Sequence, residues 1–446
     1  MRVFLLFVML FFFSVGKIYA YELVLPKEKK SIANTKYALF IGKANCNEQI
    51  EINGKNVFIA SNGAFAHTVK LKDGENRIVI RSNFNTQVYK IYKSYPTTNI
   101  KQNLIEFEPT LFEVKKDNTP LRSTPEDFGL NRLSHLFLGT NLLINGEQDG
   151  FYRVILSKNK NAWISKNSVK ISKDIIVPEF KTMYSETFKN ATVHNIEFTE
   201  KLPYTVEDCE DEIVFKVYNP FITKDSVYTI NIKKPKKYSY KTILEDTKYS
   251  FKVTEFPKKQ SDLEGIIITI DAGHGGAEKG AVGCLNHFEK DINLDIALEL
   301  KKILSSLGAN VVMTRECDGA VSLDDRVKIA RENESNIFLS IHLNSIPDIE
   351  MNIHKNRGTS VYHYNKNSKI LADLIRESIV KSLKTRDDGT RTASFAVIRP
   401  TDYIGVLIEV AYMTNPIDSI LYTKEDFSVE TAKAIAESLL NFVNND

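Results

Sequence analysis

Residues 265–270 read GIIITI and residues 271–276 read DAGHGG, and this junction decides the fold of the C-terminal part of the chain. A continuous apolar run followed by glycines is typical of a strand that is buried on both faces and ends in a tight loop. Strand-like and helical patterns then alternate as far as the C-terminus. This order predicts an α/β domain over residues 262–446, with a mainly parallel sheet flanked by helices.

The hydrophobic periodicity predicts the further elements of this domain. A helix is expected to begin near Asn286 and to end at Gly308, because apolar residues recur at helical spacing over residues 296–307. Strands are predicted at 310–314, 336–341 and 406–410, and helices at 323–332, 368–383 and 429–443. In sheets of this kind, ligands bind at the carboxyl ends of the strands.

Four polar residues fall at these predicted ends. His274 follows the first strand and His342 follows the strand at 336–341. Glu409 lies near the end of the last strand, and Glu289 lies near the start of the first helix. Two imidazoles and one carboxylate, with a fourth position left open, form the ligand set of a catalytic Zn²⁺ ion. We therefore predict that His274, Glu289 and His342 bind zinc and that the remaining carboxylate acts as a base.

Each of these residues also has a purely structural interpretation. Glu289 stands three residues after Asn286, as in a capping box, and His342 fits a hydrogen-bonded histidine at a strand end. Glu409 is harder to explain in this way, because a carboxylate buried among Val, Leu and Ile costs several kcal/mol unless a cation or donor compensates it. Three histidines without such a context are expected to be surface or structural residues: His287, His354 and His363.

The C-terminal domain resembles the zinc-dependent N-acetylmuramoyl-L-alanine amidases of the amidase_3 type. The matching blocks stand in order at residues 271–276, 289–294, 314–315, 323–326, 340–344, 397–399 and 408–410. The resemblance implies that His274, Glu289 and His342 bind zinc and that Glu409 is the catalytic acid/base. It implies a peptidoglycan hydrolase that cleaves the amide bond between N-acetylmuramic acid and the L-alanine of the stem peptide, in wall turnover or cell separation. Asp271 or Asn344 is expected to orient the ligands from behind.

The chain departs from the family pattern at three places. Leu343 replaces alanine, Gly405 replaces proline, and Ala411-Tyr412 replaces a glycine-phenylalanine pair. We expect these changes to alter the lining of the substrate groove and to leave the ligands intact. Some long members of the family carry a regulatory insertion with an inhibitory helix before the last strand, but residues 384–399 are too few to hold one, so the enzyme is expected not to be gated in that way.

Two other functions stay open at the level of the sequence. A zinc peptidase that cuts within the stem peptide would use the same four residues, and only the family-specific spacing argues against it. A non-catalytic cell-wall-binding protein with a vestigial amidase fold is the second alternative. It would have no use for Glu409.

Strands and turns predominate upstream, which predicts three β-rich domains. In residues 21–100, short alternating runs are separated by Asn53-Gly54, Asn62-Gly63 and Asp73-Gly74, and such dipeptides favour hairpin turns. This spacing resembles the small Ig-like modules of exported bacterial enzymes. Residues 173–260 are similar to the AMIN domain, which directs some wall amidases to peptidoglycan. Strands are expected there at 199–204, 213–219 and 228–232, and a last strand and a linker at 233–264.

Residues 109–172 resemble a bacterial SH3-like module. The resemblance rests on the Arg122-Ser123 turn, a strand at 139–144 led by glycine, and a strand at 150–154 that contains Tyr152. A last strand begins near Trp163, whose ring is expected in the small core. Such modules often bind wall peptides or glycans, although a plain spacer is the alternative.

The first 20 residues have the pattern of a secretory signal peptide. Arg2 precedes an apolar run at residues 3–13, and the small residue Ala20 gives a cleavage site. The run is too short to span a bilayer, which needs about 20 residues. The sequence therefore predicts an exported protein of the periplasm or cell wall, with an uncleaved anchor or a buried strand as the alternative. The four cysteines contain no CxxC pair and indicate no dense disulfide framework: Cys46, Cys209, Cys284 and Cys317.

The charge is unevenly distributed along the chain. The 446 residues have a formal net charge of +3 and are 43% hydrophobic, which excludes global disorder. Residues 21–261 hold 37 Lys and Arg against 28 Asp and Glu, whereas residues 262–446 hold 20 against 28. The basic front half predicts contact with anionic wall polymers, or else only serves solubility. Peptidoglycan is the expected partner, and nucleic acid is not.

Overall fold

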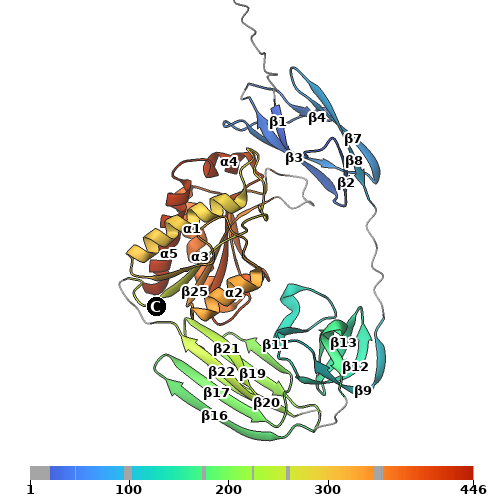
Figure 1. Ribbon diagram of the computed structural model, residues 1–446, viewed down its shortest axis with the longest axis vertical. Helices are drawn as coiled ribbons and strands as arrows, with labels where there is room; N and C mark the ends of the chain where they lie inside the picture. Colours follow the sequence, from blue (N-terminus) through green and yellow to red (C-terminus); the bar gives the residue numbers. More distant parts are fainter. Residues whose placement is uncertain are drawn as a thin grey trace, which may run out of the picture.

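A six-stranded sheet forms the centre of the α/β domain (Figure 1). The computed structural model describes residues 21–45, 47–94, 103–172, 177–222, 226–257, 262–345, 353 and 355–444. The sheet has the order β24-β23-β25-β28-β26-β27. Its strands are β23 (Ile267–Ala272), β24 (Asn310–Met313), β25 (Ile337–Asn344), β26 (Thr359–His363), β27 (Asp387–Thr392) and β28 (Ile404–Tyr412).

The sheet is parallel over the four strands that the sequence predicted. β23 pairs in parallel with β24 and β25, and β25 pairs in parallel with β28. β26 and β27 were not predicted, and β26 runs antiparallel to β28. β27 reads DDGTRT, so it lacks the apolar residues by which a strand is recognised in a sequence.

Three long helices cover one face of this sheet. They are α1 (Glu289–Ser306), α3 (Lys369–Leu383) and α5 (Phe427–Asn444), and they form one core with the apolar residues of β23, β25 and β28. A smaller core on the other face lies under α2 (Leu323–Glu332) and the 3₁₀ turn η4 (Ala396–Ile398). A short helix, α4 (Pro416–Tyr422), follows β28, and a 3₁₀ turn, η3 (Lys366–Ser368), precedes α3.

The first β-domain is a sandwich of two sheets, with orders β1-β3-β6 and β2-β8-β7-β4-β5. Asn53-Gly54 forms the predicted hairpin turn, and Asn53 has a φ of 50°. The hairpin prediction at Asp73-Gly74 is wrong, because β6 and β7 on either side of it belong to different sheets. The strands are β1 (Tyr21–Leu25), β2 (Lys30–Ala33), β3 (Tyr37–Ala44), β4 (Glu51–Ile52), β5 (Lys55–Asn56), β6 (Ala64–Lys70), β7 (Gly74–Arg81) and β8 (Thr86–Lys93).

The second β-domain is a single antiparallel sheet of seven strands, ordered β11-β10-β14-β13-β12-β9-β15. Trp163 on β14 is half-buried, between Ala162 and Ile164, which are fully buried. Because side chains alternate along a strand, the Trp163 ring faces away from the core, and its predicted core role is wrong. The elements are β9 (Ile105–Val114), β10 (Thr119–Arg122), η1 (Gly129–Asn131), β11 (Arg132–Leu136), β12 (Asn141–Gln148), β13 (Phe151–Ser157), β14 (Lys160–Ser165), η2 (Lys166–Ser168) and β15 (Val169–Ile171).

The third β-domain consists of two antiparallel sheets, β16-β17-β22-β21 and β18-β19-β20. The prediction of a strand at 199–204 is wrong for most of this segment, which is a connection. β18 begins only at Tyr204, the last residue of the predicted range. Residues 233–264 hold a two-stranded hairpin instead of the expected single strand and linker. The strands are β16 (Phe180–Phe188), β17 (Ala191–Phe198), β18 (Tyr204–Asp208), β19 (Glu212–Tyr218), β20 (Val227–Lys233), β21 (Tyr238–Glu245) and β22 (Lys248–Glu255).

The second and third β-domains share one continuous hydrophobic core. Ser134 on β11 donates a hydrogen bond to the carbonyl of Tyr204, and the Tyr204 hydroxyl donates to the carbonyl of His135 at 2.8 Å. The third β-domain in turn is fixed to the α/β domain, where the amide of Tyr240 donates to Thr401 at 2.7 Å and the Phe256 ring packs edge-on against Phe442.

Several sequence predictions concern residues that the structure does not describe. The predicted signal peptide at 1–20, Cys46 and His354 lie outside the described residues. Cys209, Cys284 and Cys317 are free thiols. No helix within the described ranges has the length and hydropathy needed to cross a membrane.

The shared core gives a stability prediction at Tyr249. Its buried hydroxyl accepts a hydrogen bond from the amide of Leu202 at 2.8 Å and donates one to the carbonyl of the same residue at 2.7 Å. Tyr249→Phe leaves both backbone groups buried and unpaired, so it should lower the free energy of unfolding by about 1–3 kcal/mol in urea titrations. Tyr184→Phe, at a tyrosine that is 43% exposed, is the matched control and should change it little. Equal effects of both variants would contradict the packing described.

Candidate metal centre and active site

Three predicted ligands converge at one end of the sheet. His274 follows β23, Glu289 is the first residue of α1, and His342 lies on β25. One ligand atom from each lies within 4.8 Å of the other two. The two imidazole rings are 4.9 Å apart between centroids and nearly perpendicular. This grouping is the arrangement that a metal ion with two nitrogen ligands and one oxygen ligand requires.

The Glu289 carboxylate lies at the centre of the group. Its Oε1 atom is 2.8 Å from Nδ1 of His342 and 3.2 Å from Nε2 of His274. Its Oε2 atom accepts a hydrogen bond from the amide of Ala281 at 2.7 Å. Burial opposes its ionisation, but the hydrogen bonds from His274 and His342 outweigh burial and hold the pKa of Glu289 below its usual range. Since α1 begins at Glu289 itself, the capping-box interpretation is wrong.

His274 is held by contacts on both sides of its ring. Its backbone has a φ of 60°, which turns the chain sharply after β23. Glu278 lies 2.9 Å from Nδ1 of the ring, opposite the Glu289 contact. Burial lowers the pKa of His274, but the hydrogen bonds to Glu289 and Glu278 reverse this effect and raise the pKa above its ordinary value. A histidine fixed by a carboxylate on its second nitrogen is typical of metal sites.

Two glycines leave the space that the ligand side chains occupy. A Cβ atom at Gly273 would lie 2.2–2.6 Å from three ring atoms of His342. At Gly280, where φ is 67°, it would lie 2.5 Å from Oε2 of Glu289 and 2.6 Å from the His274 ring. The loop between β23 and α1 therefore forms a close backbone cradle, and the residues present fit a bound zinc ion.

Glu409 lies beside this group on the neighbouring strand. It pairs with His342 across β25 and β28, and its Oε2 atom is buried without a hydrogen-bond partner among the described residues. Burial, followed by the charge of Glu289, raises the pKa of Glu409 well above its usual range. A buried carboxyl oxygen without a partner is costly in a folded protein, so its position indicates a role toward a ligand.

A buried ion pair supports the cradle from behind. Arg326 contacts Asp271 at 2.5 Å and donates to the carbonyl oxygens of Ala272 and His274 at 2.8 and 2.9 Å. Among the described residues, Asp271 contacts Arg326, Thr314 and Ser340 and none of the predicted ligands, so it acts on the loop through Arg326 and not on the ligands themselves as expected. The Asn344 Oδ1 atom accepts a hydrogen bond from the amide of Ser345 at 2.8 Å. No contact between the Asn344 side chain and a predicted ligand is found in the described part of the chain.

The three departures from the family pattern do not line a groove as predicted. Leu343 and Ala411 are fully buried in the main core. Gly405 is the second residue of β28, four residues before Glu409, and its amide donates to Ser368 Oγ at 3.1 Å, a bond that proline cannot make. Tyr412 is buried against the first β-domain.

Other predicted residues lie apart from the site. His363 is buried and its ring contacts the carbonyl of Asn365, so it is structural. His287 is exposed at the surface, with its ring edge-on to Tyr422. Residues 384–399, described throughout, contain β27 and η4 and no α-helix.

Three contributors to the site were not predicted from the sequence: Glu278, Gly280 and Asn293. Asn293 donates hydrogen bonds to Glu289 Oε1 and to the carbonyl of Gly273, both at 3.3 Å. Its position one helical turn after Glu289 was a usable signal, because residues four apart share a helix face. Glu278 and Gly280 gave no such signal, since their roles depend on how an irregular loop folds.

Comparisons with known proteins agree on the C-terminal part of the chain. The Amidase_3 family profile, described as N-acetylmuramoyl-L-alanine amidase, matches residues 268–441. The uncharacterized protein YqiI of Bacillus subtilis is 36% identical over 181 residues, which cover 40% of this chain and 84% of YqiI. The amidase LytC of the same organism is 35% identical over 183 residues, or 41% of this chain and 36% of LytC. The chain therefore spans about a third of LytC.

Solved structures match the same part of the chain. The catalytic domain of CwlV, an N-acetylmuramoyl-L-alanine amidase from Bacillus (Paenibacillus) polymyxa var. colistinus, is 33% identical. The match covers 41% of this chain and 99% of that domain, with a TM-score of 0.38.

The buried ion pair gives a stability prediction at Asp271. Asp271→Asn leaves the charge of Arg326 buried and uncompensated, so the free energy of unfolding of the α/β domain should fall by about 3–5 kcal/mol. Asp402→Asn removes the partner of Arg331, which is 52% exposed, and should cost at most about 1 kcal/mol. Calorimetry of both variants tests this difference, and similar losses would show that the Asp271 pair does not carry the cradle.

The cradle gives a separate prediction at Gly273. Gly273→Ala forces the His342 ring to move, so zinc affinity measured by calorimetric titration should fall by about 10–100-fold. Gly319→Ala is the matched control, because the nearest atom to its new Cβ is 4.0 Å away. Unchanged zinc binding by Gly273→Ala would show that His342 is not a ligand.

Proposed function

The chain belongs to the N-acetylmuramoyl-L-alanine amidase family, and from that premise we propose a zinc-dependent hydrolase of peptidoglycan. The α/β domain hydrolyses the amide bond between N-acetylmuramic acid and the L-alanine of the stem peptide. The observation that carries the zinc assignment is the convergence of three ligand atoms within 4.8 Å, next to the unpaired carboxyl oxygen of Glu409.

His274, Glu289 and His342 would hold the zinc ion. Zinc, when bound in such a site, polarises the amide carbonyl and activates water for attack. Glu289 is kept in place by the amide of Ala281, and His274 by Glu278, so both ligands are oriented before the metal arrives. The Gly273 backbone leaves His342 the room it needs.

Glu409 carries the proton transfers. Its free oxygen takes a proton from the attacking water and returns it to the alanine nitrogen, which must be protonated to leave. No neighbouring donor in the described chain competes for this oxygen. The same feature argues against a non-catalytic binding protein, since a binding surface gains nothing from a buried, unpaired carboxyl. The family membership argues against a peptidase that cuts within the stem peptide.

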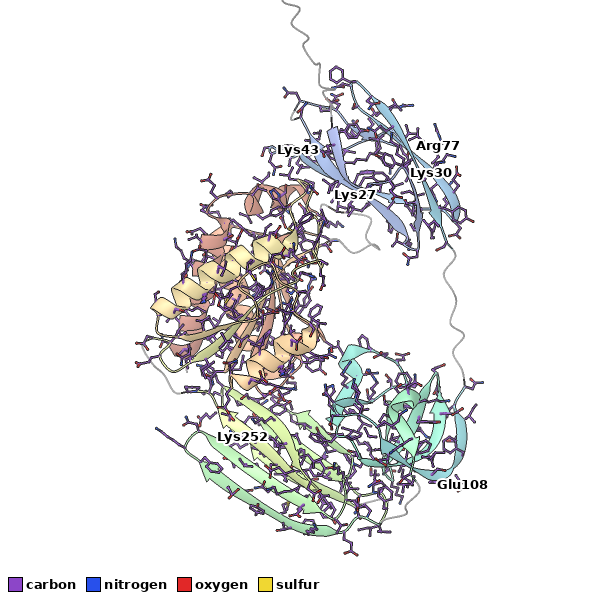
Figure 2. All side chains as sticks on the ribbon, viewed as in Figure 1. Lys27, Lys30, Lys43, Arg77, Glu108 and Lys252 are labelled. Atoms are coloured by element: carbon purple, nitrogen blue, oxygen red, sulfur yellow. The ribbon has the colours of Figure 1, made fainter. Side chains whose placement is uncertain are left out.

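The upstream part of the chain directs the enzyme to its substrate. We propose that residues 1–20 are a signal peptide that exports the protein to the periplasm or cell wall, and that residues 109–172 and 173–260 are SH3-like and AMIN-like modules that contact peptidoglycan. A domain with 12 Lys and Arg against 6 Asp and Glu, at residues 21–94, suits anionic wall polymers. Figure 2 shows Lys27, Lys30, Lys43 and Arg77 on this domain.

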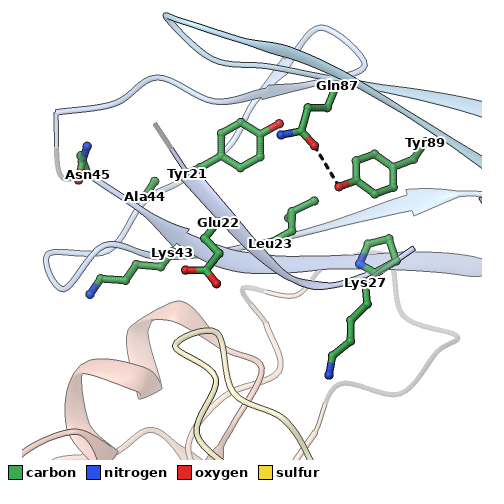
Figure 3. A pocket seen from close by; sticks show the side chains of 10 residues that line it. Tyr21, Glu22, Leu23, Lys27, Lys43, Ala44, Asn45, Gln87 and Tyr89 are labelled. Carbon is green, nitrogen blue, oxygen red and sulfur yellow. Dashed lines mark hydrogen bonds between the residues drawn. The ribbon is translucent and has the colours of Figure 1, made fainter. Parts of the chain in front are cut away.

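The first β-domain also contains a pocket of about 400 Å³ (Figure 3). Tyrosines line it together with charged side chains, among them Tyr21, Tyr89, Glu22, Lys27 and Lys43. The Tyr89 hydroxyl contacts Gln87 at 3.2 Å. Aromatic surfaces next to charges of both signs suit a polar wall fragment.

The proposed reaction is tested with residues 21–446, loaded with zinc and given isolated peptidoglycan. Stem peptides with a free N-terminal L-alanine should appear, identified by mass and by end-group analysis, and should disappear on chelation. Glu409→Gln should lower the rate by about 10²–10⁴-fold while zinc stays bound.

Glu437→Gln, at an exposed position of α5, is the matched control and should keep full activity. Fragments cut within the peptide would replace this proposal by the peptidase. Binding without any release would leave a wall-binding protein.

A further inference from the structure

The sheet β1-β3-β6 of the first β-domain is apolar on both faces. Along β3, Ala38 and Phe40 point into the sandwich core, and Leu39 and Ile41 point to the other side. β6 repeats the pattern, because Phe65 enters the core and its neighbours face outward. A sheet whose second face is apolar must bury that face against another element.

The α/β domain covers this second face. Ile41, Ala64 and Ala66 are at most 1% exposed, and they form one cluster with Cys284 and Tyr412 of the α/β domain. The same cluster includes Val282, Leu285 and Ile420 as partly buried members. β6 lies against α4, and Figure 1 shows α4 on the side of the α/β domain that faces the first β-domain. The Asn62 side chain donates a hydrogen bond to Ser419 Oγ of α4 at 3.1 Å.

The covered segment at 281–285 is the one that orients Glu289. The amide of Ala281 donates to Glu289 Oε2 at 2.7 Å, and the amide of Glu289 donates back to the Ala281 carbonyl at 3.0 Å. A bridge between Val282 and Phe288 closes the segment into a small loop. One side of this loop thus holds a predicted zinc ligand, and its other side rests on the first β-domain.

The second contact point lies close to Glu409. Tyr412 is three residues further along β28 and is 4% exposed. Its amide donates to Asp418 Oδ2 at 2.9 Å, and its hydroxyl donates to Asp388 at 2.8 Å. Cys284 donates to the carbonyl of Thr414 at 3.4 Å, which joins the two contact points. The first β-domain therefore contacts both segments that lead to the site, residues 281–285 and the end of β28 at Tyr412.

We propose that the first β-domain is a structural part of the active site. By covering the apolar side of residues 281–285, it holds the Ala281 amide against Glu289 and so fixes the carboxylate in its ligand position. Ala64, Ala66 and Ile41 are positioning residues in this scheme: the two small alanine side chains let the loop approach the sheet closely, and Ile41 fills the apolar contact. The expected loss of activity rests on the proposed zinc amidase function, whereas the expected loss of zinc affinity does not require that function.

The test compares two substitutions to glutamate on the first β-domain of the chain 21–446. Ala66→Glu places a charge inside the contact, whereas Phe84→Glu changes a side chain that is 83% exposed on the same domain. Zinc affinity, measured with zinc alone in the absence of substrate, should fall by about 10–100-fold in Ala66→Glu and stay unchanged in Phe84→Glu. In Ala66→Glu, kcat should fall together with the zinc affinity, and KM should change less than kcat.

Small-angle scattering and proteolysis of the chain between the β-domains show whether Ala66→Glu has released the domain. Release of the first β-domain from the α/β domain with unchanged zinc affinity and kcat would overturn the inference. If Ala66→Glu does not fold, Ile420→Ser weakens the same contact from the α4 side and should give the same loss of zinc affinity. A Phe84→Glu chain that binds zinc but releases no stem peptide would refute the proposed function and leave the metal readout valid.

Discussion

The Glu289 carboxylate is the contact on which the rest of the site depends. Its Oε1 atom meets both imidazoles, and its Oε2 atom accepts from the Ala281 amide, so one buried group joins β25, α1 and the loop after β23. A carboxylate that is only 4% exposed is stable there because each of its two oxygens accepts hydrogen bonds. Helix, loop and strand must therefore be placed correctly together, and the two cradle glycines make that close approach sterically possible.

The environment of the Glu409 carboxyl group differs from that of Glu289. Glu409 lies across from His342 on the adjacent strand, yet one of its oxygens has no partner in the described chain. Stability alone would select a paired or apolar residue at such a position. In the proposed mechanism, the paired Glu289 holds a cation and the unpaired Glu409 moves a proton. The parallel pairing of β25 with β28 places Glu409 directly opposite His342.

The sequence predicted the four site residues because they stand at ends of elements that its periodicity also predicted. It could not predict Glu278 or Gly280, whose contacts depend on an irregular loop, nor β27, which has no apolar pattern. The burial of the outward face of β3 could not be predicted from the sequence either. Alternation shows that Leu39 and Ile41 share a face, but in a sandwich either face is a plausible core, and only the fold shows what covers the second one.

The proposed mechanism requires that His274, Glu289 and His342 hold one metal ion and that Glu409 is left free of it. Anomalous diffraction at the zinc edge, from crystals of residues 21–446 grown with zinc, locates the ion directly. This assignment predicts a single strong peak within bonding distance of those three side chains, with the Glu409 carboxyl facing it but not bound. A peak ligated by Glu409 in place of one of the three, or located away from them, would contradict it.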